Sequence, residues 1–257
     1  MRLIILGSGT SFGVPQIGCS CAVCVSTDPR DRRTRVAAVV ETDAGARILI
    51  DTPPELRLQL ISAGIPDIDA VLYTHDHADH VHGIDDLRAI SARRGRLPVY
   101  GPADMLERLL QRFSYIFDEE MPRQPETPRP ELSLIPLKPG IEVDIAGLRV
   151  LPLEFAHGRT RVFGYRFGAL AYLTDVGAVP PAMVERLRGV QVLVVNALFE
   201  QPHPAHLSIP QAIELARAVG ARRTLLTHLT HRHGHAELAA RLPPGVEPAY
   251  DGLTIAF

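Results

Sequence analysis

Seven consecutive residues at 74–80, Thr-His-Asp-His-Ala-Asp-His, constrain this chain more than any other stretch. They directly follow an apolar run at 70–73, so three imidazoles and two carboxylates fall where a buried strand would end. Histidine and aspartate are poor core residues and need partners to be buried at all. A metal site explains this cluster. The alternative, a solvated polar loop that happens to contain histidine, leaves the His-x-His-x-Asp-His spacing unexplained.

The spacing can be interpreted as ligand geometry. In an extended backbone His75 and His77 are two residues apart and point the same way, so both can reach one cation. Asp79 and His80 lie beyond the turn, where we expect them to face a second cation beside the first. The stretch therefore predicts a centre with two metal ions.

The cysteines form a second compact pattern. Cys19, Cys21 and Cys24 are the only three in the chain, and an odd number within six residues does not suit a disulfide framework. Three thiolates at this spacing can wrap one face of a soft, tetrahedral cation and leave the fourth ligand to come from elsewhere. A redox-active or incidental cysteine group is the alternative.

Length, charge and hydrophobicity are those of an ordinary soluble enzyme. The chain has 257 residues, 46% of them hydrophobic, and no low-complexity linker, so we expect a single domain over 1–257. Its net charge of −2 gives no general attraction for nucleic acid or an acidic membrane surface. The apolar run at 3–6 is too short for a signal peptide and no later run approaches a membrane span, so we expect a cytoplasmic protein.

Strand and helix patterns alternate along the first half, which indicates an α/β fold. We expect strands at 2–6, 36–41, 47–50, 70–73 and near 98–100, and helices at 55–63, from 82 onward and at 105–117. The stretch 118–130 is rich in proline and charge, so we expect an exposed loop that either borders the site or is a plain surface excursion.

The second half begins with β segments. We expect strands at 132–137, 141–145, 148–154, 162–167, 170–173, 190–196 and 224–227, and a helix at 181–188. Ser208 with Gln211 three residues later is a capping-box pattern, which predicts the start of another helix.

Several further strand ends carry polar side chains that suit metal chemistry. His157 and Asp175 would add a third imidazole and a carboxylate able to bridge two metals. His206 lies just before a well-defined helix start, a fixed place from which to act on a substrate. Asp51 also ends a strand, and from the sequence it could equally orient a metal ligand or cap the helix that begins near Pro54.

A ligand series spread over nearly the whole chain resembles that of the metallo-β-lactamase superfamily: His75, His77, Asp79, His80, His157, Asp175 and His228. The resemblance implies an αβ/βα sandwich of two mixed sheets packed face to face, with helices on the outer faces. It implies one divalent metal ion held by His75, His77 and His157. The second would be held by Asp79, His80 and His228, with Asp175 as the bridge.

Within the superfamily, the cysteine triplet and residues 227–231 resemble the phosphoribosyl 1,2-cyclic phosphate phosphodiesterases of the carbon–phosphorus lyase pathway. This resemblance implies that Cys19, Cys21, Cys24 and His231 hold a structural zinc ion. It also implies that His206 is catalytic. The closing residues 250–252 are similar to that family's C-terminal pattern.

Two related families offer alternatives. The carrier-like protein B of pyrroloquinoline quinone synthesis shares the cysteine pattern but lacks the complete His-x-His-x-Asp-His set, which is intact here. Ribonuclease Z shares the active-site ligands but lacks the cysteine cluster and presents a long basic, glycine-rich arm to transfer RNA. The acidic stretch at 118–130 is a poor substitute for that arm, because phosphate contacts need lysine and arginine.

We therefore predict a metal-dependent phosphodiesterase that hydrolyses a small, cyclic phosphodiester such as 5-phosphoribosyl 1,2-cyclic phosphate. Two divalent ions roughly 3.5 to 4 Å apart lower the pKa of a bridging water, so that hydroxide can attack phosphorus near neutral pH. Asp79 would orient this nucleophile, and His206, if cationic, would protonate or stabilise the leaving oxygen.

The expected cofactors are two divalent ions, Mn²⁺ or Zn²⁺, which imidazole and carboxylate ligands accept alike, together with one structural Zn²⁺. The expected partner is a small phosphorylated substrate, with no membrane and no nucleic acid, and the resemblance implies a homodimer. The alternatives are an RNA-processing nuclease similar to ribonuclease Z and a non-catalytic carrier-like protein of cofactor biosynthesis.

Overall fold

Two mixed sheets of seven strands each form the centre of the molecule. The structure, a computed structural model, describes residues 1–118, 120 and 128–257. The first sheet has the order β14-β1-β2-β3-β4-β5-β6, antiparallel from β14 to β3 and parallel from β3 to β6. Its strands are β1 (Arg2–Gly7), β2 (Ala37–Glu41), β3 (Arg47–Ile50), β4 (Ala70–Leu72), β5 (Leu97–Pro102), β6 (Leu132–Leu137) and β14 (Thr254–Ala256).

The second sheet repeats this arrangement with the order β13-β12-β11-β10-β9-β8-β7. It is antiparallel from β7 to β10 and parallel from β10 to β13. Its strands are β7 (Val143–Ile145), β8 (Leu148–His157), β9 (Thr160–Phe167), β10 (Leu170–Leu173), β11 (Val192–Asn196), β12 (Arg223–Thr227) and β13 (Val246–Pro248).

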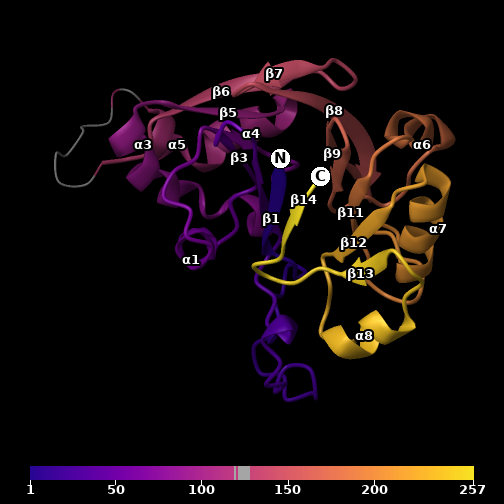
Figure 1. The fold of residues 1–257 in the computed structure, drawn as a ribbon. Coiled ribbons are helices and arrows are strands. Elements are labelled where there is room, and N and C mark those ends of the chain that lie inside the picture. Colours follow the sequence, from indigo (N-terminus) through magenta and orange to yellow (C-terminus); the bar gives the residue numbers. More distant parts are fainter. Residues whose placement is uncertain (119, 121–127) are drawn as a thin grey trace.

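Helices cover the outer face of each sheet, and the two sheets lie between the helical layers (Figure 1). The helices of the first half are α1 (Leu56–Ser62), α2 (Ala78–Val81), α3 (Arg88–Arg94), α4 (Ala103–Arg112) and α5 (Ser114–Phe117), with 3₁₀ turns η1 (Pro29–Asp31) and η2 (Ile84–Leu87). The helices of the second half are α6 (Pro181–Leu187), α7 (Ile209–Val219) and α8 (His235–Arg241). This is the αβ/βα sandwich that the resemblance implied, and the predicted fold class is confirmed.

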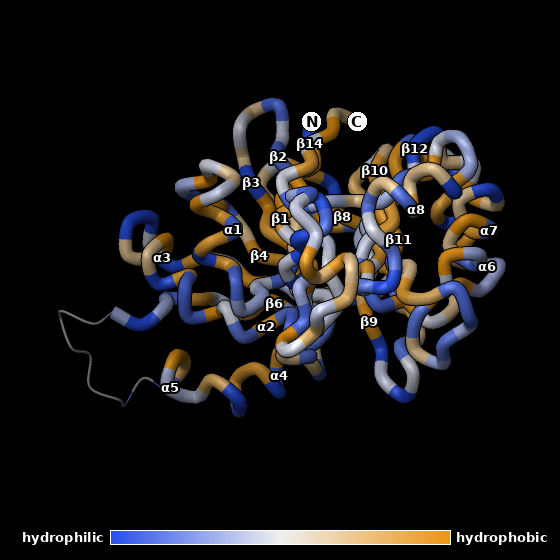
Figure 2. Tube along the Cα trace, turned by 90° about the horizontal axis from the view of Figure 1, so that it is seen from below, coloured by the Kyte–Doolittle hydropathy of each residue, from blue (hydrophilic) through white to orange (hydrophobic). Residues whose placement is uncertain are grey.

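Alternation along each strand builds three apolar layers. In β1, Leu3 and Ile5 join the core between the sheets, whereas Ile4 and Leu6 face the helices of the first half. In β11, Val194 faces the central core, and its neighbours on either side in the strand pack under α6 and α7. Because both faces of the central strands are covered, the sequences of these strands are continuous apolar runs and do not alternate between apolar and polar residues. In Figure 2, strands such as β3, β4 and β11 are accordingly orange, whereas many turns at the periphery of the molecule are blue.

Most predicted elements are present, but several boundaries differ. The strand predicted at 148–154 runs on to His157 as β8, so His157 is the last residue of a strand. The helix predicted at 105–117 is two helices, because Phe113 adopts φ −117° and ψ 43° and interrupts the turn. The helix expected from 82 begins as the 3₁₀ turn η2 and continues as α3. Of the loop predicted at 118–130, residues 119 and 121–127 lie outside the described residues.

Five short elements were missed, including η1 and α2, which lie in stretches with no predicted helix. Helix α8 has Gly234 at its N-cap and no side-chain cap, so it carries no start signal. Strands β13 and β14 contain three residues each, too few to show a period of alternating apolar residues.

The predicted capping box is confirmed: Gln211 N–H donates to Ser208 Oγ (3.4 Å), and Ser208 N–H donates to Gln211 Oε1 (2.9 Å). Within the described residues, no helix combines the length and apolar character needed to cross a bilayer.

The Asp251 carboxylate fastens the loop that follows β1, residues 8–13, which contains Gly9 and Gly13 and is called the glycine loop below. Asp251 Oδ1 accepts from Ser8 N–H (2.9 Å) and Ser8 Oγ (2.8 Å), and its Oδ2 accepts from Thr34 N–H (2.7 Å) and Thr34 Oγ1 (2.6 Å). The same loop pairs with the segment after β12, since Thr10 N–H donates to Leu229 O (3.1 Å). The glycine loop is therefore held beside His228 by the C-terminal segment.

We predict that Asp251→Ala lowers the free energy of unfolding by about 2–4 kcal/mol, because four donors, two of them on the fully buried Ser8, lose their acceptor. Urea unfolding followed by circular dichroism measures this change. The matched control is Glu185→Ala, which removes an exposed carboxylate paired with Arg188 and should cost less than about 0.5 kcal/mol. Equal stabilities of the two variants would contradict the role given to Asp251.

Candidate metal centre

The polar side chains of the centre come from the ends of strands in both sheets. His75 follows β4 of the first sheet, while His157 ends β8, Asp175 follows β10 and His228 follows β12 of the second. The carboxyl ends of parallel strands are a favoured edge for ligand sites, because the loops that leave them converge there. Residues far apart in the sequence thus meet at one edge of the sandwich.

Three residues that directly follow or lie just after strands of the two sheets adopt a left-handed backbone. Asp51 has φ 62°, Asp175 φ 58° and His228 φ 58°, although none is glycine. For non-glycine residues this conformation costs energy and persists only where surrounding contacts impose it, which is common at functional sites. In each case the turn directs the side chain into the cluster.

The first group is formed by His75, His77 and His157. His157 Nε2 lies 3.3 Å from His77 Nδ1, and the ring centroid of His75 is 4.6 Å from that of His77. One nitrogen from each of the three rings lies within 4.8 Å of the others, close enough to share one cation. The three residues are those that the resemblance implied for the first metal.

The second group is formed by Asp79, His80 and His228, whose ligand atoms also lie within 4.8 Å of one another. Asp175 lies between the two groups. Its Oδ2 is 3.3 Å from His80 Nε2 and its Oδ1 is 3.1 Å from His228 Nε2, and it forms a further candidate group with His75 and His80. The structure thus brings all seven residues together in the predicted arrangement, and their assignment as ligands stays a prediction.

Hydrogen bonds orient the rings from behind. Asp51 Oδ2 accepts from His80 Nδ1 (2.7 Å), and both Asp51 oxygens accept from Thr74, one from its N–H and one from its hydroxyl. His157 Nδ1 lies 2.9 Å from the backbone oxygen of Ala205. These contacts turn the opposite nitrogens of both rings toward the centre, as in metal sites where an outer partner fixes the tautomer.

The two roles left open for Asp51 are now resolved. Helix α1 has Glu55 at its N-cap with no side-chain cap bond, so Asp51 does not cap it. Asp51 is fully buried and its oxygens are engaged by His80 and Thr74. It orients a candidate ligand.

The donor set fits divalent cations. His75 Nε2 is buried and makes no hydrogen bond to the described residues, a costly arrangement unless another group satisfies it. Burial opposes ionisation of Asp175, yet His228 and His80 together outweigh it and hold the pKa of Asp175 well below its usual range. Burial likewise opposes a charge on His80, but Asp175, Asp79 and Asp51 raise its pKa well above the usual value. The centre is therefore an anionic pocket that favours positive charge.

His206 joins the cluster from the segment before α7. Its Nδ1 lies 3.5 Å from Asp175 Oδ1, and its ring stacks on that of His228 with centroids 4.7 Å apart. Burial, followed by the proximity of His228, lowers the pKa of His206 to about 3. The ring is thus neutral at pH 7 in the chain alone, so the condition under which a cationic His206 was expected is not met.

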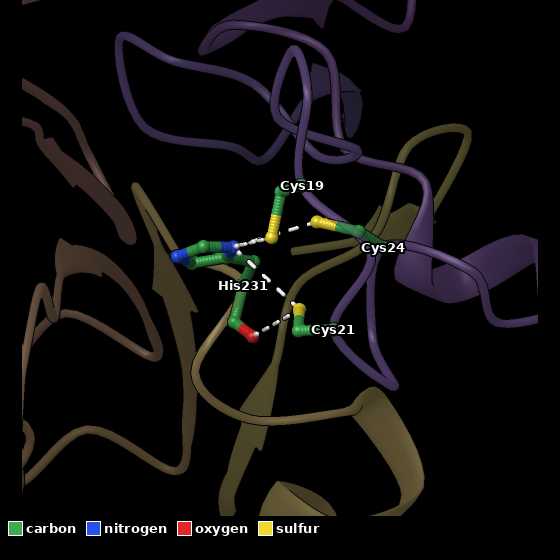
Figure 3. Close-up of side chains that lie close together, drawn as sticks. All are labelled: Cys19, Cys21, Cys24 and His231. Atoms are coloured by element: carbon green, nitrogen blue, oxygen red, sulfur yellow. Dashed lines mark hydrogen bonds between the residues drawn. The ribbon is translucent and has the colours of Figure 1, made fainter.

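The cysteines gather around one imidazole nitrogen (Figure 3). His231 Nδ1 lies 3.3 Å from Cys19 Sγ, 3.7 Å from Cys21 Sγ and 3.4 Å from Cys24 Sγ. Tetrahedral zinc with ordinary Zn–S and Zn–N bonds places nitrogen and sulfur about 3.6 Å apart, so this spacing fits one zinc ion. Burial raises the pKa of Cys24 to about 11, so a cation is needed to hold that sulfur as a thiolate. The predicted zinc set is therefore brought together, and its occupancy stays a prediction.

A cavity of about 330 Å³ opens beside His206 and His228. The glycine loop forms one wall and the segment before α7 forms another. Its lining residues are Thr10, Ser11, Phe12, Gly13, Gln16, Leu198, Phe199, His203, His206, His228, Thr230, His231 and Arg232. Sequence reasoning missed Phe199, His203 and Arg232, although the density of histidine and arginine at 228–235 was a usable signal.

A protein-family model for the beta-lactamase superfamily domain matches residues 46–229, a segment that begins just before β3 and ends just after His228. The chain belongs to the metallo-β-lactamase superfamily. This is the family that the dispersed ligand series resembled, and it is a family of metal-dependent hydrolases.

Three relatives of this metallo-β-lactamase superfamily member align with most of its length, beyond the segment that the family model matches. A crystal structure described as a new diphosphatase from the PhnP family is 40% identical, with a TM-score of 0.91, covering 100% of this chain and 97% of that one. A ribonuclease Z of Methanopyrus kandleri is 31% identical over 88% of this chain and 93% of its own length. An octanoyltransferase of Porphyromonas gingivalis is 43% identical over 98% of this chain, which spans about half (51%) of that protein.

We predict that Asp51→Asn weakens metal binding by about 10- to 100-fold, because His80 loses the carboxylate that orients its ring. Titration against a competing chelator measures the affinity. Asp67→Asn, which alters a surface ion pair with Arg93, should leave the affinity unchanged. Wild-type affinity in Asp51→Asn would show that His80 is oriented by other contacts.

We also predict that Cys21→Ser removes about one equivalent of zinc and lowers the melting temperature while leaving the metals of the other centre in place. Metal analysis of the purified variant with Ser20→Ala as the neighbouring control tests this. Full zinc content in Cys21→Ser would defeat the assignment of the cysteine cluster as a zinc site.

Proposed function

We propose that this chain hydrolyses a small phosphodiester, such as 5-phosphoribosyl 1,2-cyclic phosphate, with two divalent ions, Mn²⁺ or Zn²⁺, in the histidine–aspartate centre. The observation that carries the proposal is the position of His206, which lies 3.5 Å from Asp175 and lines the cavity beside the centre. Bound divalent ions would supply charge that polarises a phosphoryl group and lowers the pKa of a water molecule.

The residues of the chain have distinct tasks in this proposal. Asp79 lies 3.3 Å from His80 in the second group, where its carboxylate can accept a hydrogen bond from an attacking water. His206, neutral in the chain alone, can donate one ring N–H to the oxygen that leaves. The negative charge of an entering phosphodiester would favour protonation of this ring, because an adjacent negative charge raises the pKa of an imidazole.

Cavity size favours a small substrate. A volume of about 330 Å³ is in the range of pockets that bury a small molecule. The similarity to a diphosphatase and the similarity to a ribonuclease Z both support a reaction at phosphorus for this chain. RNA processing is the second candidate, which the 31% identity to the Methanopyrus kandleri ribonuclease Z favours.

The assay uses the metal-loaded protein with three substrates. Hydrolysis of bis(p-nitrophenyl) phosphate distinguishes an enzyme from a non-catalytic carrier. Comparison of 5-phosphoribosyl 1,2-cyclic phosphate with precursor transfer RNA then distinguishes the two enzymatic functions. Chelation should abolish activity, and restoration by Mn²⁺ or by Zn²⁺ identifies the working metal. Absence of hydrolysis of every phosphodiester by the loaded protein would overturn the proposal.

We predict that His206→Ala lowers kcat by about 100-fold or more with unchanged metal content, because the leaving oxygen loses its proton donor. The matched control is His82→Ala, which removes an exposed histidine that packs against Phe113 and belongs to none of the candidate metal groups. If His206→Ala kept full activity, His206 would have no part in the reaction. If it lost metal, His206 would be a ligand instead.

A further inference from the structure

A continuous row of rings leads from the candidate metal centre along the wall of the cavity. The ring of His228 stacks on His206, His206 lies 5.3 Å from His203, and His203 lies 5.9 Å from Phe199, measured between centroids. The guanidinium carbon of Arg232 then lies 4.6 Å above the Phe199 ring. All five side chains line the same cavity. A molecule held at the metals would therefore extend along this row toward Arg232.

The loop that carries Arg232 is fixed on both sides. Its preceding residue, His231, belongs to the cysteine cluster (Figure 3). Arg33 is only 1% exposed and donates to the backbone oxygens of Thr230 and His233. The backbone of this loop is therefore arranged in advance, so holding Arg232 in place costs little extra ordering on binding.

The wall that carries Phe199 is fixed as well. The neighbouring residue Glu200 accepts from Arg241 (2.6 Å) and contacts His233 Nε2 (3.2 Å), which ties this segment to α8 and to the loop of Arg232. The stacked pair of Arg232 and Phe199 therefore joins two anchored segments.

Arg232 has the properties of an anion-binding group. Its side chain makes no ion pair with any carboxylate in the part of the chain that the structure describes. Stacking on an aromatic face leaves the N–H edge of a guanidinium free, and that planar edge matches a phosphate with two parallel hydrogen bonds. The net charge of −2 provides no general attraction, so a local cation is what would hold a second negative group.

We propose that Arg232, stacked on Phe199, binds a second, terminal phosphate of the substrate while the reacting phosphodiester occupies the metal centre. The inference rests on the proposed function and narrows its substrate class to small phosphodiesters that carry an additional phosphate monoester at the far end. Arg232 is then a specificity-determining residue rather than part of the hydrolytic step.

The first test compares two substrates that differ only in this group, ribose 1,2-cyclic phosphate with and without a 5-phosphate. The wild-type protein should prefer the 5-phosphorylated form in kcat/KM, and Arg232→Ala should reduce that preference by about 10- to 100-fold. Activity on the unphosphorylated form and on bis(p-nitrophenyl) phosphate should stay within about twofold. Arg232→Lys, which keeps the charge but not the planar edge, should recover only part of the preference.

Two controls separate specificity from structure. Arg222→Ala removes an exposed arginine at the opposite end of β12 and should leave the preference intact. Zinc content of Arg232→Ala should match the wild type, which shows that the adjacent His231 is undisturbed. Equal loss of activity on both ribose substrates, or an unchanged preference in Arg232→Ala, would overturn the inference.

The second test requires no turnover. Opening one ester bond of a 1,2-cyclic phosphate leaves a phosphate monoester, so ribose 1-phosphate and ribose 1,5-bisphosphate serve as product-like probes for calorimetry. The wild-type protein should bind the bisphosphate about tenfold or more tightly than the monophosphate, and Arg232→Ala should bind both alike. Equal binding of both probes by the wild type would refute the role of Arg232. Absence of phosphodiester hydrolysis together with a clear preference for the bisphosphate would instead refute only the hydrolytic function.

The anion could also come from a nucleic acid backbone, and a third arm tests this source. Competition by a short single-stranded RNA should be weak and equal in wild type and Arg232→Ala. Strong RNA competition that Arg232→Ala abolishes, with the ribose preference unchanged, would overturn the proposal for a small substrate.

Discussion

The need to neutralise buried carboxylates underlies the whole arrangement. Asp51 and Asp175 are almost completely buried, and both contact His80, which also lies 3.3 Å from Asp79. Ionised carboxylates in a protein interior cost several kcal/mol each unless cations accompany them, by the general cost of burying charge. A single imidazolium can meet only part of that requirement. The centre is therefore stable as a unit only together with positive charge, and this couples the fold to metal binding.

Only part of this centre could be predicted from the sequence. The His-x-His-x-Asp-His stretch and the strand-end positions of His157 and Asp175 are local signals. The order of strands and helices indicated an α/β fold, whereas the sandwich of two mixed sheets was implied by the resemblance of the ligand series. The pairing of Asp51 with His80 was not readable, because it depends on β3 lying beside β4 and on a left-handed turn at Asp51. Neither the neighbouring strand nor the turn has a sequence signature of its own here.

The wall of the cavity is a second feature that could not be predicted from the sequence. Phe199 and Arg232 are 33 positions apart in the chain, and each alone looks like an ordinary surface residue. Their contact depends on the loop after β12 and on the ion pairs of Glu200 with Arg241 and His233. Helix α8, which supplies Arg241, gave no recognisable start signal in the sequence. A specificity element of this kind therefore becomes visible only when the tertiary contacts are known.

The cysteine cluster has a consequence for the way this protein is made. Its sulfur atoms belong to the beginning of the chain, and His231, which completes the set, lies 212 positions after Cys19. During translation the three thiols leave the ribosome long before their imidazole partner is synthesised. Nascent chains therefore pass through a period in which these sulfurs are open to oxidation. If the cluster binds zinc as predicted, the zinc supply of the growing cell would affect the yield of correctly assembled protein.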